Sequence, residues 1–199
     1  MKLHYASAFM VAGLLAAFPA RADDTVNRIG QTPAADCFDA AGMVSHTGTA
    51  LPDVLHKDAM ASCTQALSGK MIAKDRIATL VNRGTIEAAS GELDAAIGDY
   101  KAALTLNPKT ADIYIDRGSA LMRAARYQEA LADFNTALSL HPTNAYIAYF
   151  NRGIAQEKLG NTMAAYQDYK QAANLAPDYQ PAKTELSRFQ TVIRTSGNG

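Results

Sequence analysis

The sequence predicts an all-α protein in which three helix–turn–helix units stack into an α-solenoid. The main observation is a self-similarity with a period of 34 residues in the second half of the chain. Each unit carries a glycine, an alanine, an aromatic residue, a second alanine and a proline in that order. These residues are Gly84, Ala96, Tyr100, Ala103 and Pro108, then Gly118, Ala130, Phe134, Ala137 and Pro142, and, one residue late, Gly153, Ala165, Tyr169, Ala172 and Pro177.

The second observation is that each repeat glycine lies inside an apolar stretch with helical periodicity. A glycine inside a helix costs about 1 kcal/mol relative to alanine, so a packing reason is needed. We expect the first repeat alanine to lie opposite the glycine on the second helix, which brings the two axes close together. The larger aromatic residue is then expected to fill the space toward the next unit.

The third observation is that each repeat proline follows an Ala- and Leu-rich stretch, where it stops the helix. Gly91 and Gly160 suit the turns inside the first and third units, and Ala125-Arg126 stands at that place in the second. The expected helix pairs are 75–90 with 93–106, 111–124 with 127–140, and 144–159 with 162–175.

Weaker patterns flank the three units. Residues 180–194 place apolar residues along one side of a helix, as expected of an extra helix that caps the last unit. Before the first unit, Ala59, Cys63 and Ala66 copy the spacing of Ala96, Tyr100 and Ala103. We therefore expect a partial unit here, a second helix whose first helix has degenerated.

The period and the order of these residues resemble the tetratricopeptide repeat, a helix–turn–helix unit that binds other proteins far more often than it catalyses. The resemblance covers roughly residues 77–177. The expected organisation is a signal peptide (1–22), a weakly structured segment (23–54), a partial repeat and connection (55–76), three repeats (77–110, 111–144 and 145–179), and a capping helix with a tail (180–199).

The N-terminus has the pattern of a bacterial secretory signal peptide. Lys2 gives a basic start, Ala6–Phe18 is apolar but short for a membrane span, and Ala20-Arg21-Ala22 offers a cleavage site. We expect cleavage after Ala22 and a periplasmic or secreted protein with no membrane association. An uncleaved anchor is the alternative.

The charge balance argues against nucleic acid as a partner. The full chain has 19 basic and 19 acidic residues. Removal of residues 1–22 takes away Lys2 and Arg21 and leaves 17 basic and 19 acidic residues. No run of Lys and Arg remains that could bind phosphates or anionic membranes.

Cys37 and Cys63 are the two cysteines of the chain, and both precede the units. An even pair in an exported chain predicts a disulfide that ties the segment 23–54 to the helix of Cys63. A metal site with His46 and His56 is the alternative, but their spacing does not fit the usual ligand pairs. We expect no metal and no cofactor.

An arginine and an aspartate recur in every unit sixteen residues apart: Arg83 and Asp99, Arg117 and Asp133, Arg152 and Asp168. A catalytic residue is needed once, whereas a structural residue is needed in every unit. We therefore expect ion pairs at the helix contacts, with ligand binding as the alternative. No phosphate loop, nucleophile elbow or metalloprotease motif is present, and no catalytic residue is predicted.

The resemblance implies a concave surface lined by the first helix of each unit. Its expected partner-binding residues are Val81, Thr85, Ile115, Ser119, Met122, Phe150, Ile154 and Glu157. Some members of the family hold a peptide carboxylate with Lys, Asn and Arg, but Val81, Thr85 and Ile147 stand at positions of that clamp. An apolar helix or extended segment fits this mostly apolar groove better, with Phe150 as its anchor. Packing against neighbouring helices is the alternative role of Phe150 and Ile154.

These observations predict a noncatalytic adaptor or assembly factor of the bacterial cell envelope, with an unidentified protein or peptide as its partner. Two alternatives stay open. One is a self-associating structural protein, a homo-oligomer whose groove holds another copy or its own segment 23–54. The other is an accessory subunit that supports a separately encoded envelope enzyme.

Overall fold

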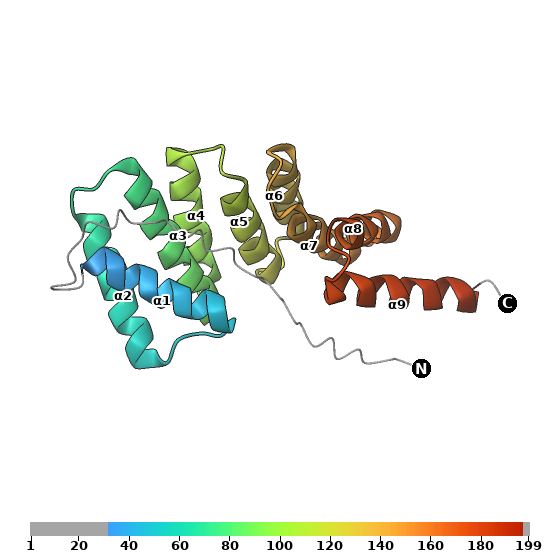
Figure 1. The fold of residues 1–199 in the computed structure, drawn as a ribbon, viewed down its shortest axis with the longest axis horizontal. Helices are drawn as coiled ribbons and strands as arrows, with labels where there is room; N and C mark the ends of the chain where they lie inside the picture. The colour runs from blue at the N-terminus through green and yellow to red at the C-terminus, as the bar shows by residue number, and fades with distance from the viewer. Residues whose placement is uncertain (1–31, 197–199) are drawn as a thin grey trace.

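The computed structural model describes residues 32–196, with side chains as far as Phe189, and this part of the chain is entirely helical. Successive helices form antiparallel hairpins that stack in a row, and the last helix extends from its end (Figure 1). The helices are α1 (Pro33–Thr47), α2 (Asp53–Ser68), α3 (Ala73–Ser90), α4 (Leu93–Leu106), α5 (Ala111–Arg123), α6 (Tyr127–Ser139), α7 (Ala145–Lys158), α8 (Thr162–Leu175) and α9 (Gln180–Ser196).

The three predicted units are the hairpins α3–α4, α5–α6 and α7–α8, with helix bounds within two residues of those expected. Each unit packs on the next through its second helix, since α4 contacts α5 and α6 contacts α7. The predicted capping helix is α9, which packs on α8. The predicted α-solenoid is therefore confirmed.

The N-terminal part differs from the prediction of a weakly structured segment 23–54, because residues 33–47 form the helix α1. The Thr32 hydroxyl accepts a hydrogen bond from the Ala35 backbone at 3.3 Å, Pro33 opens the helix, and Gly48 ends it with a φ of 67°. The first helix of the partial unit is thus present, and α1 packs on both α2 and α3. Residues 23–31 lie outside the described part, as does the predicted signal peptide.

The cysteines Cys37 and Cys63 are joined across α1 and α2, with their Cα atoms 4.8 Å apart. Both are fully buried in a cluster of small side chains that includes Ala41 and Val44 of α1. Ile86 of α3 closes this cluster. Since Cys63 stands where the other units have their aromatic residue, the disulfide links the two helices at the place of an aromatic contact.

The repeat glycines make room for the aromatic ring of their own unit, in addition to the expected approach of the alanine in the first and third units. A Cβ atom added to Gly118 would lie 2.7 Å from the Phe134 ring, and one added to Gly153 would lie 2.8 Å from the Tyr169 ring. The alanine of the second helix contributes its backbone, because the Ala165 carbonyl would lie 3.3 Å from the Cβ added to Gly153.

The turns inside the units use the left-handed backbone region. Gly91 and Gly160 have φ values of 87° and 82°, and Ala125 takes the same region at 58°. An L-residue is strained there by about 1–2 kcal/mol, so the second unit carries a cost that the glycines of the other two avoid.

We expect Gly118→Leu to lower the free energy of unfolding by at least about 1–3 kcal/mol, because the new side chain collides with the Phe134 ring. Urea unfolding monitored by circular dichroism measures the change. Lys101→Ala, on an exposed side chain, is the control and should have little effect. Coincident unfolding curves for the two variants would show that the contact of Gly118 with Phe134 is wrong.

No helix in the described range 32–196 is long and apolar enough to cross a membrane.

Candidate functional site on the inner face

The first helices of the units, α3, α5 and α7, line one face of the array. Neighbouring first helices contact each other, α3 with α5 and α5 with α7, whereas the second helices of successive units make no comparable contact. The array therefore curves toward its first helices. We call the surface of α3, α5 and α7 on this side the inner face.

Five of the eight predicted groove residues are buried. Thr85, Ile115, Ser119, Met122 and Phe150 expose between 4 and 9% of their surface. The remaining three, which are Val81, Ile154 and Glu157, are partly exposed. The inner face is thus more tightly packed than the sequence suggested. That these eight residues bind a partner protein stays a prediction.

The apolar side chains of the inner face join neighbouring units. Ile115 and Met122 of α5 pack with Ile147 of α7 in one core cluster. The Phe150 ring lies 5.6 Å from the Tyr169 ring and 5.2 Å from the Tyr179 ring. Phe150 therefore connects α7 to α8 and to the start of α9, which agrees with the packing role that the sequence left open.

A row of polar residues on the inner face was missed by the sequence analysis. Asn82, Asp116 and Asn151 stand at the same position of the three units, and each exposes less than a tenth of its surface. The Asn151 amide donates a hydrogen bond to the Ser119 hydroxyl at 3.1 Å, which joins α7 to α5. The 34-residue period could have found this row, since it aligns the three positions.

Asp116 is the one acidic member of this row. Its burial raises the pKa of the carboxyl well above the ordinary value, and repulsion from Asp112 raises it further. Burial also raises the pKa of Asp112, one helical turn earlier. Burial raises the pKa of the Tyr100 hydroxyl of α4, and the charge of Asp116 across the junction of the first two units raises it further.

Glu87 of α3 is a second buried carboxyl, with 5% of its surface exposed. Its Oε1 lies 3.9 Å from the Arg83 Nε, and its Oε2 has no hydrogen-bond partner. Burial, followed by repulsion from Asp99, raises the pKa of Glu87 to about 7, and the nearby Arg83 opposes this shift.

The raised pKa of Glu87 predicts a pH dependence of stability. The unfolded carboxyl titrates near its ordinary value of about 4.3, so ionising the folded one costs free energy as the pH rises from about 4 toward 8. We expect Glu87→Gln to raise the free energy of unfolding at pH 8 by about 1 kcal/mol and to have little effect at pH 5.

Urea unfolding of the wild type and Glu87→Gln at both pH values measures this difference. Asp178→Asn removes an exposed carboxylate and should leave the difference between pH 5 and pH 8 as in the wild type. An equal effect of Glu87→Gln at both pH values would contradict the assignment.

The predicted arginine–aspartate pairs form inside every unit. The Arg83 guanidinium donates two hydrogen bonds of 2.6 and 2.7 Å to the Asp99 carboxylate. The same two-bond geometry recurs in the pairs Arg117–Asp133 and Arg152–Asp168. The three aspartates are buried, so loss of an arginine would leave an unpaired charge inside the unit. The structural interpretation of this periodic pair is confirmed.

Within residues 32–196, no group of three His, Cys, Asp or Glu side chains is arranged to hold a metal ion. Cys37 and Cys63 bond to each other, which removes both thiols from the alternative metal site. His56 lies between two side chains instead, with its Nδ1 2.9 Å from the Ser90 hydroxyl and its Nε2 3.4 Å from a Glu92 carboxylate oxygen. These contacts tie α2 to the turn of the first unit.

The stacked hairpins and their inner face define a helical repeat scaffold. A family model described as the tetratricopeptide repeat matches residues 81–145 and again residues 115–179. The repeat units of this chain therefore belong to the tetratricopeptide repeat family. No curated protein matches the sequence significantly.

Solved structures with the same fold include two domains that hold peptides. The first tetratricopeptide repeat domain of Spaghetti (RPAP3), bound to the HSP90 peptide SRMEEVD, is 25% identical, with a TM-score of 0.58 over 63% of this chain and 99% of that one. The second such domain of human RPAP3, in complex with the HSP70 peptide SGPTIEEVD, is 26% identical, with a TM-score of 0.56 over 60% and 98%. MamA, 20% identical with a TM-score of 0.61 over 73% and 80%, shares the fold.

Proposed function

We propose that this chain is a noncatalytic adaptor or assembly factor of the bacterial cell envelope that binds a segment of a partner protein on its inner face. The observation that carries the proposal is the uncovered part of that face. Among the described elements, α1 packs on α2 and α3, whereas α9 packs on α8 and reaches only the end of α7, where the Arg188 guanidinium lies 2.6 Å from the Glu157 carboxylate. Val81, Ile154 and Glu157 keep part of their surface exposed there.

Two further observations support the proposal. The repeat family has a noncatalytic, protein-binding fold, and the related RPAP3 domains hold peptides of other proteins. The joined cysteines suit an oxidising compartment such as the periplasm, in agreement with the predicted signal peptide. Export would be supported by an intact mass beginning at Asp23 for protein recovered from its native host, and retention of residues 1–22 would favour an anchor.

Site-specific photo-crosslinking in the native envelope tests the binding surface. A photoreactive amino acid at position 81 or 154 should give crosslinked adducts, because both positions lie on the inner face. The same amino acid at Lys101 or Gln128, which are exposed on second helices, is the control. Adducts at the control positions alone would place the partner on the outer face and refute the proposal.

Self-association is the second candidate, and one observation favours it. Large apolar side chains stay exposed on α8, with Met163 at 72% and Leu175 at 49%. Light scattering over a range of concentrations distinguishes a monomeric adaptor from an oligomer. An oligomer that dissociates when Met163 is replaced by serine would support self-association through α8.

A further inference from the structure

The junction between the first two units lacks a hydrogen bond that the next junction has. Between the second and third units, the Asn151 amide donates to the Ser119 hydroxyl. The equivalent residues of the first junction are Asp116 and Thr85, each one period earlier. The Thr85 hydroxyl donates to the Val81 carbonyl at 2.9 Å and lies 3.4 Å from the Tyr100 hydroxyl, so it makes no bond to Asp116.

Asp116 is therefore a buried carboxyl without a partner. It exposes 6% of its surface, no hydrogen bond or ion pair of its carboxyl is found among the described residues, and its oxygen atoms are not fully sealed from the inner face. A largely buried acceptor that lacks a donor carries a free-energy cost, and the cost is greater when the acceptor is charged. Asparagine, which units one and three carry at this position, would avoid most of that cost.

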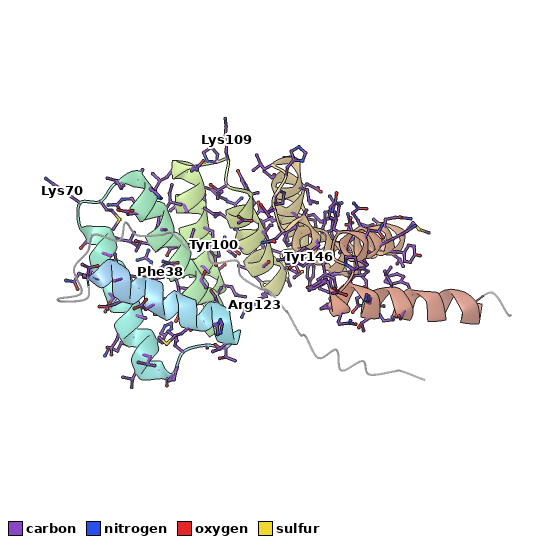
Figure 2. The ribbon with its side chains drawn as sticks, viewed as in Figure 1. Phe38, Lys70, Tyr100, Lys109, Arg123 and Tyr146 are labelled. Atoms are coloured by element: carbon purple, nitrogen blue, oxygen red, sulfur yellow. A yellow bond between two sulfur atoms is a disulfide. The ribbon has the colours of Figure 1, made fainter. Side chains whose placement is uncertain are left out.

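The surroundings of Asp116 favour a positive charge. Asp112 lies one turn away on the same face of α5 and is partly exposed, so it connects the buried carboxyl to the solvent. Glu87 of α3 adds a third carboxyl near Tyr100. Arg123 stands at the end of α5 (Figure 2), and its guanidinium donates to the Ala88 carbonyl.

The outer side of the same junction also lacks one hydrogen bond that the neighbouring junctions have. Arg83 donates from its Nη1 to Thr64 of the preceding hairpin, and Arg152 donates in the same way to Asn135. At the first junction the equivalent residue opposite Arg117 is Lys101, which has no acceptor to offer. The first two units are joined instead by Arg123, which donates to the Ala88 carbonyl, and by Arg126, which lies 3.6 Å from an Asp94 carboxylate oxygen.

We propose that Asp112 and Asp116 bind the side chain of an arginine or lysine in a partner segment that lies on the inner face. This inference rests on the proposed function and adds the chemistry of the partner. A guanidinium or ammonium group would supply the donors that Asp116 lacks, in a charge-assisted hydrogen bond shielded from water. The peptides held by the RPAP3 domains, SRMEEVD and SGPTIEEVD, end in acidic residues and carry the opposite charge at that end.

A positional-scanning library of fluorescein-labelled nonapeptides tests the inference by fluorescence anisotropy. Each pool fixes one residue type at one position. For at least one position, the wild type should bind the arginine or lysine pool about tenfold more tightly than the leucine or glutamine pool. The preference should fall to about twofold or less in Asp116→Asn and should weaken in Asp112→Asn.

Thermal unfolding gives a second measurement on the same variants. Asp116→Asn should melt at a higher temperature than the wild type, because its amide can donate to the Thr85 hydroxyl as Asn151 donates to Ser119. Asp178→Asn removes the same charge from an exposed site and should keep both the melting temperature and the peptide preference of the wild type.

The outcomes that overturn the inference are distinct from one another. Pools that bind without a preference for basic residues, or a preference that survives in Asp116→Asn, would refute the basic side chain and leave the proposed function intact. Failure of every pool to bind would refute the proposed function together with this inference. A thermal shift caused by calcium or magnesium in the wild type but not in Asp116→Asn would assign the carboxyls to a metal ion instead.

Discussion

Replacement of both cysteines by alanine is expected to release α1 from the array and to lower the stability of the N-terminal hairpin by about 3–4 kcal/mol, the chain-entropy value for a loop of this length. The Cys37–Cys63 bond closes a segment with a sequence separation of 26 residues. Apart from Val44, the buried side chains that α1 itself contributes are cysteine and alanine, so little apolar area remains to hold the helix once the bond is lost.

Hydrogen exchange measured by mass spectrometry checks this prediction. Residues 33–47 should lose their protection in the double variant, whereas α5 to α8 should keep theirs, because each hairpin of a solenoid contacts only its neighbours. Reductant should have the same effect on the wild type and none on the variant. Full protection of α1 in the variant would show that Ala40, Ala41, Val44 and Ile86 suffice to hold it.

The fold of the three units could be predicted because each unit solves the same packing problem with the same residues. The Phe134 ring packs against Gly118 at a fixed sequence separation, and a proline follows before the next helix begins. Such constraints are local to one unit, so they appear in the sequence as a period.

The helix α1 could not be predicted in this way because its unit uses a different contact. A disulfide between Cys37 and Cys63 replaces the glycine–aromatic contact. Its partners are 26 positions apart in the sequence, whereas Gly118 and Phe134 are 16 positions apart. The period is thus lost although a helical hairpin remains. The N-cap Thr32 and the terminal Gly48 were the local signals that could have indicated the helix.

The candidate site was predicted only in part, because burial on the inner face depends on how neighbouring units stack. The sequence identified the helices that line this face but treated Ile115 and Met122 as accessible, whereas α7 covers both. The free-energy cost of burying the Asp116 carboxyl could not be seen in the sequence either, because it depends on Thr85 and Tyr100 in the preceding unit. The period aligns the positions that meet between units, but it does not show which of their side chains are buried when the units stack.

Phe150→Ala is expected to lower the free energy of unfolding by about 3–5 kcal/mol, as truncation of a buried aromatic residue does. The Phe150 ring is 95% buried and packs on Tyr169 and Tyr179, so its loss would leave a cavity where α7, α8 and the start of α9 meet. Urea unfolding measures the change. The matched control is Phe38→Ala, because that ring is 37% exposed and its truncation should cost clearly less.

This variant also decides between the two roles that the sequence allows for Phe150. If the ring only packs, Phe150→Ala should lose stability, and the peptide affinity measured at a temperature where it remains folded should change little. If the ring anchors a partner, the variant should unfold like the wild type and should lose binding by a factor of about ten or more. The observed burial predicts the first result, and the second result would restore Phe150 to the binding surface.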